Sequence, residues 1–264
     1  MKIVCMVKIV PDVDKFEYDF ESNTVVRDNV RMILNPDDAS GVGFALKVKS
    51  MKPDTIVEVV TMAPESVEPL LLDLARVGVD RVTYISDPIF SGSDSYATSK
   101  ILAKYLETTS YDCILTGTHA IDGDTSHVPA QLGELLDLCQ MSNVIKIDED
   151  ALDESKVVFT VDNDTSVSTY EMKLPGILSI QKESNYKLPY IKYEDINKDV
   201  NDQINIISND DLAFEKGKVG LEGSLTKVNR TFVKEYKKRN KVVVGNDEQG
   251  IETVYSFLKD KGFV

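Results

Sequence analysis

The sequence predicts an α/β fold: a Rossmann-like, open and mostly parallel sheet with helices on both faces, followed by a C-terminal arm. In the first half, short β-branched segments alternate with segments of helical periodicity, the pattern of strand–helix–strand units. With 264 residues, 42% of them hydrophobic, the chain can bury one full core and carry an appendage. From about residue 186 regular apolar repeats become rare, which predicts a segment that lies on something else.

Strand and helix signals follow one another in order along the first half. Apolar, β-branched runs predict strands at residues 2–10, 55–62, 81–85 and 112–117. Apolar residues at helical spacing predict helices at residues 38–50, from about 64, and at 94–106 and 126–138. Asp37 or Asp38 is expected to cap the first helix, and Pro64 lies near the start of the second. Gly41 and Gly43 lie inside the first helical pattern, where we expect them to serve packing.

The pattern changes after residue 144. Strand-like pieces at residues 156–161, 166–172 and 176–181 predict hairpins that close the sheet. We therefore predict an α/β domain at residues 1–185 and an extension at 186–264 that packs on a partner. The last predicted element is an amphipathic helix at 250–261.

Charge and composition exclude several classes of protein. The net charge of −14 makes a nucleic-acid backbone a poor partner, so no nucleic-acid binding is expected. No apolar run approaches the roughly 18 residues of a membrane span, so we expect no membrane insertion. Neither a signal peptide nor a transit peptide is predicted. Cys5, Cys113 and Cys139 are far apart in sequence and are expected to be free thiols, which favours a cytoplasmic protein.

One segment has the opposite charge. Seven basic residues and a single acid, Glu235, lie between Lys227 and Lys241. The segment is either a solvated helix or loop, or an arm that docks on an acidic partner surface, and charge alone does not choose between the two.

The most informative stretch follows the strand that ends at Gly117. Ligands of parallel α/β sheets bind beyond the carboxyl ends of the strands, and here a polar loop precedes a helix. Gly123 permits a positive φ, so the backbone N–H groups could turn inward. The start of the next helix offers free N–H donors and a positive dipole end, which suit a phosphate. The predicted binding residues of this loop are Asp122, Gly123, Asp124, Thr125, Ser126, His127 and Val128.

The loop contains no lysine or arginine, whereas a nucleotide-hydrolysing P-loop needs a lysine on the phosphates. It therefore fits a pyrophosphate or monophosphate that is held without being broken, and the alternative is an ordinary polar turn with an N-cap. Metal-ligand spacings and hydrolase motifs are missing, so we predict no catalytic side chain and no metal. Met6, Asn35 and Met62 lie at other strand ends, and if these ends converge they would line an adenosine pocket.

Several motifs resemble, in order, those of electron transfer flavoprotein β-subunits. Residues 7–12 resemble the family's Val-Lys-Gln-Val-Pro-Asp, residues 35–38 its Asn-Pro-x-Asp, and residues 62–64 its Met-Gly-Pro. Residues 78–81 resemble Gly-Ala-Asp-Arg, residues 120–125 the nucleotide loop, and residues 220–224 with the last helix the C-terminal arm. The resemblance covers essentially the whole chain.

The resemblance implies a fold like that of the adenine-nucleotide α-hydrolases and a nucleotide-binding role for residues 1–185. It also implies a non-catalytic adenosine pocket, an obligate α-subunit that binds its own FAD, and a C-terminal region that embraces that subunit. The implied pocket residues are Met6, Asn35, Met62, Ala120 and those of the loop from Gly123 to Val128.

The family divides on what fills this pocket. Ordinary members hold a structural AMP, and their loop resembles Asp-Asp-Asp-x-Asn-Gln-Thr. Electron-bifurcating members hold a second FAD that takes a hydride from NADH, and their loop resembles Asp-Gly-Asp-Thr. Gly123 and Thr125 fit the second group. So do Phe90, Gly92, Asp94 and Thr98, which resemble that group's Asp-Arg-x-Phe-x-Gly-Ala-Asp-Thr.

Other positions depart from that second group. Pro88 stands where the group has arginine, which removes a cation that could meet the phosphates of a nicotinamide cofactor. Residues 126–129, Ser-His-Val-Pro, replace Ala-Gln-Val-Gly. A basic residue expected near Val161 and a glutamine or glutamate expected near Ser168 are both missing.

Three functions remain in view. In the first, electrons pass from NADH to an FAD in this chain, then to ferredoxin and, through the α-subunit FAD, to a partner dehydrogenase of the acyl-CoA or 2-hydroxy acid type. In the second, AMP fills the pocket and the chain completes its partner's structure. The third, a free-standing adenine-nucleotide sensor, is disfavoured by the thin core after residue 186.

Overall fold

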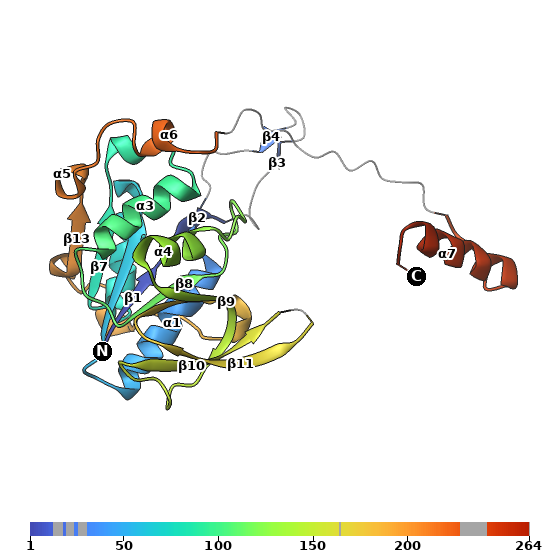
Figure 1. Cartoon of the computed structure of the whole chain (residues 1–264), viewed down its shortest axis with the longest axis horizontal. Helices are drawn as coiled ribbons and strands as arrows, with labels where there is room; N and C mark the ends of the chain where they lie inside the picture. The colour runs from blue at the N-terminus through green and yellow to red at the C-terminus, as the bar shows by residue number, and fades with distance from the viewer. Residues whose placement is uncertain (13–17, 20–23, 26–30, 164, 228–241, 264) are drawn as a thin grey trace. The chain divides into compact units, whose positions relative to one another are not determined.

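The computed structural model describes residues 1–12, 18–19, 24–25, 31–163, 165–227 and 242–263. The chain divides into two compact units, residues 1–227 and residues 228–264. The first unit holds the sheet and its helices, and the described part of the second unit holds one helix (Figure 1).

Nine strands form the main sheet of the first unit, in the order β11-β10-β9-β12-β8-β1-β6-β7-β13. Neighbouring strands from β9 to β13 in this order run parallel, while β10 and β11 add an antiparallel hairpin at one edge. The strands are β1 (Lys2–Met6), β6 (Ile56–Met62), β7 (Arg81–Ile85), β8 (Cys113–Gly117), β9 (Cys139–Ile147), β10 (Lys156–Asp162), β11 (Val167–Lys173), β12 (Gly176–Ile180) and β13 (Ile204–Ile207).

Helices cover both faces of this sheet, as predicted (Figure 1). Successive strand side chains point to opposite faces, so Ile3 and Cys5 belong to one hydrophobic cluster while Val4 and Met6 belong to another. The helices α1 (Pro36–Met51) and α2 (Glu68–Arg76) pack on the first face. The helices α3 (Ser95–Leu106) and α4 (Val128–Leu136) pack on the second.

Shorter elements complete the described chain. Two small antiparallel pairs are β2 (Ile9–Pro11) with β5 (Met32–Leu34), and β3 (Tyr18–Asp19) with β4 (Thr24–Val25). The remaining helical turns are η2 (Glu65–Val67), η3 (Pro88–Phe90), η4 (Lys182–Ser184), η5 (Tyr193–Asp195), η6 (Asn201–Gln203), α5 (Asn209–Leu212) and α6 (Gly220–Gly223).

The prediction that hairpins close the sheet was right for β10 and β11 and wrong for β12. Strand β12 lies in the middle of the sheet, parallel to both β8 and β9. All five of its residues are buried, which suits a strand covered on both faces. Periodicity identifies such a run as a strand but does not reveal its neighbours, and it also missed β9 and β13.

The expected cap of α1 was also wrong. Asn35 occupies the N-cap position without a side-chain cap bond, and Pro36 starts the helix. Asp37 and Asp38 are buried instead, and their carboxylates accept hydrogen bonds from other segments. Gly43 does serve packing: a Cβ there would lie 2.7 Å from the backbone carbon of Lys187.

Residues 186–227 belong to the first unit. Tyr186 packs against Phe44 of α1 with the ring centroids 5.0 Å apart, and β13 pairs with β7 at the sheet edge. The basic run lies almost wholly at residues 228–241, outside the described residues. The interpretation of residues 186–264 as a partner-binding extension stays a prediction.

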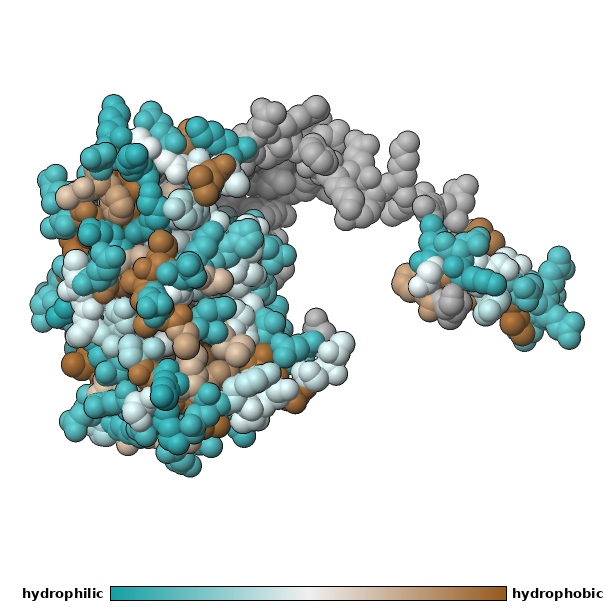
Figure 2. Space-filling model, viewed as in Figure 1, coloured by the Kyte–Doolittle hydropathy of each residue, from teal (hydrophilic) through white to brown (hydrophobic). Residues whose placement is uncertain are grey.

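The last helix is confirmed as α7 (Glu248–Asp260) of the second unit. Ile251, Val254, Tyr255 and Leu258 follow one another at the spacing of a single helix face. The first three are 45–63% exposed, and Figure 2 shows apolar residues among hydrophilic ones on this helix.

No described helix is long and apolar enough to cross a membrane. All three cysteines are free, with Cys5 and Cys113 buried and Cys139 exposed.

Candidate functional site

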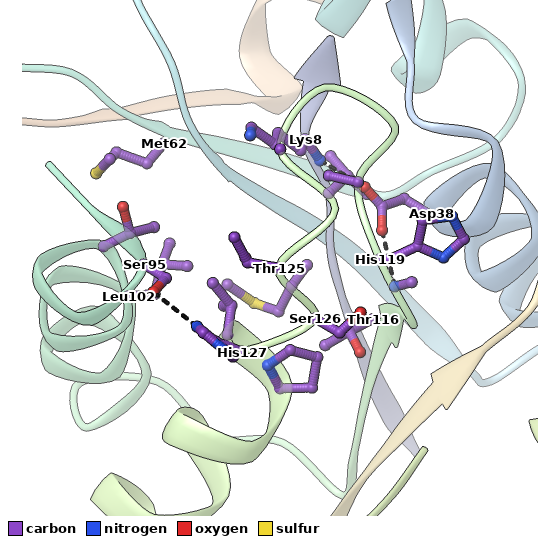
Figure 3. Close-up of a pocket in the computed structure, with 18 of the residues that line it drawn as sticks. Lys8, Asp38, Met62, Ser95, Leu102, Thr116, His119, Thr125, Ser126 and His127 are labelled. Carbon is purple, nitrogen blue, oxygen red and sulfur yellow. Dashed lines mark hydrogen bonds between the residues drawn. The ribbon is translucent and has the colours of Figure 1, made fainter. Parts of the chain in front are cut away.

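A cavity of about 330 Å³ lies at the carboxyl ends of β1, β6 and β8 (Figure 3). From β1 the chain continues to β6 and β7 on one side, whereas β8 lies on the other side of β1. Such a reversal of strand order opens a crevice between the connecting loops, which is where open α/β sheets bind ligands. The cavity therefore occupies the binding position that the topology predicts.

Two kinds of surface line the cavity. Hydroxyl groups of the first turn of α3 and of the loop before α4 face apolar side chains at the strand ends and on both helices. The lining residues are Met6, Val7, Lys8, Asp38, Met62, Ser93, Asp94, Ser95, Thr98, Leu102, Thr116, Gly117, Thr118, His119, Ala120, Gly123, Thr125, Ser126, His127, Val128 and Pro129.

Asp38 joins the ends of β1 and β8 beneath the cavity. Its Oδ2 accepts a hydrogen bond from Lys8 N–H at 2.8 Å, and its Oδ1 accepts one from Gly117 N–H at 2.7 Å. Burial raises the pKa of Asp38 to about 7, while these two hydrogen bonds oppose the rise. Gly117 must lack a side chain, because a Cβ there would overlap this carboxylate.

Asn35 and Asp37 hold the loop that follows β8. The Asn35 side chain donates to His119 O at 2.8 Å and accepts from Ile121 N–H at 3.2 Å. Asp37 Oδ2 lies 3.1 Å from His119 Nδ1 and accepts from His119 N–H at 3.3 Å. The start of α1 thus fixes both the backbone and the imidazole of the loop from below.

The loop turns on two residues in the left-handed region, Asp124 with φ 47° and Ser126 with φ 52°. The prediction that Gly123 supplies the positive φ was wrong. Aspartate tolerates this region because its short polar side chain can hydrogen-bond locally. Gly123 instead leaves space, since a Cβ there would have no atom within 4 Å.

The single lysine among the described lining residues is neutralised. Lys8 Nζ lies 2.8 and 2.7 Å from the two carboxylate oxygens of Asp122. The loop carboxylate thus meets a lysine rather than a ligand, and the cavity presents hydroxyl groups and helix N-termini as its polar donors.

The first turn of α3 forms the opposite wall. Asp94 caps this helix, because its Oδ1 accepts a hydrogen bond from Ala97 N–H at 2.9 Å. Burial raises the pKa of Asp94, but hydrogen bonds from Ala97, Thr226 and Leu225 outweigh it and lower the pKa below its usual value. Ser95 Oγ lies 3.4 Å from Nδ1 of His127, so a contact spans from α3 to the start of α4 (Figure 3).

Comparison with known proteins identifies the family of the chain. The family model described as "Electron transfer flavoprotein domain" matches residues 22–211. An electron transfer flavoprotein subunit beta of Thermoanaerobacterium thermosaccharolyticum is 31% identical, with 99% of each chain covered. The chain belongs to the electron transfer flavoprotein β-subunit family. A β-subunit of Clostridium acetobutylicum is also 31% identical, over 100% of both chains. The caffeyl-CoA reductase-Etf complex subunit CarD of Acetobacterium woodii is 30% identical, again over 100% of both.

Most of the binding residues predicted for this electron transfer flavoprotein chain lie together at the cavity. Those in its lining are Met6, Met62, Asp94, Thr98, Ala120, Gly123, Thr125, Ser126, His127 and Val128.

The other predicted residues lie around the cavity rather than in its lining. Asn35 and Asp122 hold the loop, as described above, and Asp124 is exposed with its Oδ1 3.9 Å from His119 Nε2. Phe90 is a core residue whose ring meets Phe214 edge-on at 6.2 Å. Gly92, with φ 74°, faces Leu221 of α6.

Sequence reasoning missed several lining residues. Ser93 and Ser95 flank the predicted Asp94, so their hydroxyl groups were available as a signal. Leu102 lies two helical turns further along α3, and nothing in its sequence context separates it from a core leucine. Asp38 was expected at a helix cap, and only the fold shows that it lies between two strand ends.

Proposed function

We propose that this chain is the nucleotide-holding subunit of a heterodimeric electron transfer flavoprotein and that it binds FAD in the cavity at the ends of β1, β6 and β8. A bound FAD would supply the redox chemistry, accepting a hydride from NADH and releasing electrons one at a time. The residues of this chain would bind and orient it.

One part of the lining suits the phosphates of FAD, and another suits a flat ring. Thr125 and Ser126 offer hydroxyl donors beside the start of α4, where uncapped N–H groups and the helix dipole favour a phosphate. Met6 and Met62 offer polarisable apolar contacts for a flat ring. The ion pair of Lys8 with Asp122 leaves no free lysine among the described lining residues, which supports holding rather than hydrolysis.

The electron route is the wider part of this proposal. Electrons would pass from NADH to ferredoxin and, through an FAD of the α-subunit, to a flavin-dependent dehydrogenase, which is flavin-based electron bifurcation. Similarity to a subunit of a caffeyl-CoA reductase complex supports a dehydrogenase of the acyl-CoA type over one for 2-hydroxy acids.

A second function is favoured by the size of the cavity. Its volume of about 330 Å³ lies near the lower end of the range for ligand pockets and suits a mononucleotide. In this alternative AMP occupies the cavity permanently, and the chain carries no electrons of its own.

Counting the nucleotides released from the purified heterodimer separates the two functions. We expect two FAD per heterodimer, one from each subunit, and bleaching of both flavins by NADH. One FAD with one AMP would establish the structural role, and an empty cavity in the heterodimer would overturn both.

Substitution of Gly123 tests whether the cavity holds the phosphates. Gly123→Asp should weaken FAD binding about fivefold, because a carboxylate near a pyrophosphate costs on the order of 1 kcal/mol at an effective dielectric near that of water. Gly123→Asn has the same shape without the charge, and Gly123→Ala controls for size, since the position has open space. Calorimetric titration with FAD measures all three, and equal affinities for the Asp and Asn variants would place the phosphates elsewhere.

A further inference from the structure

The first turn of α3 has two sides, one facing the cavity and one contacting the end of the first unit. Its inner side presents Ser93, Ser95 and Thr98 to the cavity. Its outer side holds residues 219–227, the end of the first unit, which we call the anchor segment. This segment immediately precedes the second unit, so it is the point where the C-terminal region leaves the sheet domain.

Asp94 is the residue that joins these two sides. Its Oδ1 caps α3, while its Oδ2 accepts hydrogen bonds from Thr226 N–H at 2.8 Å and Thr226 Oγ1 at 2.9 Å. The Asp94 N–H donates to Ser224 Oγ at 2.8 Å. Both carboxylate oxygens are therefore engaged within the chain, and Asp94 acts as a positioning residue rather than as a ligand.

The rest of the anchor segment is held by the same short region. Leu221 N–H donates to Ser91 O at 3.0 Å, and Lys100 Nζ donates to the neighbouring Lys218 O at 2.9 Å. Gly220, with φ 66°, packs so closely on Ile89 that a Cβ would overlap its carbonyl oxygen. Residues 89–100 thus supply the contacts that attach the anchor segment.

Val219 is buried in the core at the start of the segment, but beyond Gly220 most of the attachment is exposed to water. Leu221, Leu225 and Thr226 are exposed, and Ser224 is the single buried polar side chain of the segment. A segment held by few buried apolar contacts opens at low free-energy cost, so its attachment can respond to a small change in α3.

We infer that occupancy of the cavity and the attachment of the C-terminal region are coupled through Asp94: a nucleotide that orders the first turn of α3 tightens the anchor segment, and a partner that holds the C-terminal region strengthens nucleotide binding. The inference rests on the proposed nucleotide site. The second effect follows from the first, because coupling between two binding events is reciprocal.

Hydrogen exchange of the full chain, with and without saturating FAD and separately with AMP, tests the coupling. In the wild type, nucleotide should slow exchange both in the loop at residues 118–127 and in the anchor segment, by about fivefold or more in the latter. In Thr226→Val, which keeps the backbone hydrogen bond but loses the hydroxyl, the slowing of the anchor segment should shrink while that of the loop stays.

Asp94→Asn is the stronger variant, because its amide group would face the Thr226 N–H with another donor. Nucleotide should then slow exchange in the loop alone, and affinity should fall about fivefold or more. Thr160→Val is the matched control. It removes a hydroxyl that lies 3.1 Å from that of Thr169 on the hairpin of β10 and β11, at the opposite edge of the sheet from β7 and β13.

The outcomes separate the coupling from the proposed function. Nucleotide that protects the loop but leaves the anchor segment unchanged in the wild type overturns the coupling alone. Absence of nucleotide binding to the wild type, both alone and in the heterodimer, overturns the proposed function and the coupling with it. Equal protection of the anchor segment in the wild type and both variants also overturns the role of Asp94.

Discussion

At the scale of single residues, the cavity is defined by charges that cancel one another. Lys8 could act as a phosphate-binding cation, but Asp122 holds its ammonium group at two oxygens. Asp37 and Asp38 bury their carboxylates against backbone N–H groups and so offer the ligand little negative charge. The described lining therefore offers hydroxyl groups and apolar side chains, with the charge of Lys8 paired and the carboxylate of Asp94 engaged by hydrogen bonds.

Asp122→Asn should release Lys8 toward the cavity and strengthen AMP binding. Removal of one carboxylate from an exposed pair leaves an unpaired cation near the phosphate, worth about 1 kcal/mol or roughly a fivefold gain in affinity. Calorimetric titration measures it. Asp124→Asn is the control, since that carboxylate is exposed and lies 3.9 Å from His119. Weaker binding in Asp122→Asn would mean that the ion pair is needed to shape the loop.

At the scale of elements, glycine positions in α1 show how closely this helix is packed from two directions. A Cβ at Gly41 would lie 3.8 Å from Leu115, an ordinary contact, whereas one at Gly43 would lie 2.7 Å from the Lys187 backbone. The same helix therefore has one replaceable glycine and one that the segment after β12 requires.

Gly43→Ala should destabilise the chain by about 1–3 kcal/mol, because the new methyl group forces the backbone near residue 187 to move. Gly41→Ala should be neutral or stabilising by up to about 1 kcal/mol, since alanine is the better helix former. Urea unfolding compares the two variants. Similar stabilities would mean that the segment at 186–188 moves away without cost.

A buried charge network centred on Glu58 ties β6 to β1, β7 and α3. Glu58 of β6 is fully buried, and its carboxylate lies 2.7 Å from Lys2 Nζ of β1. It also accepts hydrogen bonds from Thr83 at 2.9 Å and Tyr105 at 2.5 Å. Burial alone would raise the pKa of Glu58, but the hydrogen bonds and the charge of Lys2 outweigh it and lower the pKa.

Glu58→Gln should cost about 3–5 kcal/mol at neutral pH, because it leaves the Lys2 ammonium group without its counter-ion. In the folded chain the pKa of Glu58 lies below its usual value of 4.5. The stabilisation is therefore fully present above about pH 4.5 and is lost as the pH falls through the lowered pKa of the folded chain. The difference in unfolding free energy between wild type and variant should therefore shrink below about pH 4.5.

The matched control is Glu171→Gln, which breaks an exposed pair with Lys156 of 2.8 Å. It should cost less than about 1 kcal/mol. A difference for Glu58→Gln that does not change with pH would contradict the shifted pKa.

At the scale of the whole molecule, the second unit exposes an apolar helix face that its own described residues leave uncovered. Substitution of both Val254 and Tyr255 by glutamate should weaken the proposed complex with the α-subunit at least tenfold, since burial of each side chain is worth about 1.5–3 kcal/mol. Both side chains belong to the second unit, so the thermal unfolding of the sheet domain is expected to stay unchanged.

Biolayer interferometry against an immobilised α-subunit measures the affinity, and Glu252→Gln, on an exposed position of the same helix, is the control. Unchanged affinity in the Val254 and Tyr255 variant would show that α7 does not face the partner.

The amino-acid sequence by itself determined the class of fold, most strands and helices of the first half, the last helix and the loop that precedes α4. These features follow from local signals: periodicity, β-branched runs and a polar stretch where a strand meets a helix. Family motifs in order along the chain pointed to an electron transfer flavoprotein β-subunit, and the comparisons confirmed this family.

Only the tertiary structure decided which segments meet. The central place of β12, the carboxylate of Asp38 between two strand ends, and the attachment of residues 219–227 to Asp94 all join segments far apart in sequence. Local patterns record how a segment packs on a sheet or a helix face, not which distant segment it packs against. Such pairings are selected by burial of the whole core and by the satisfaction of buried polar groups.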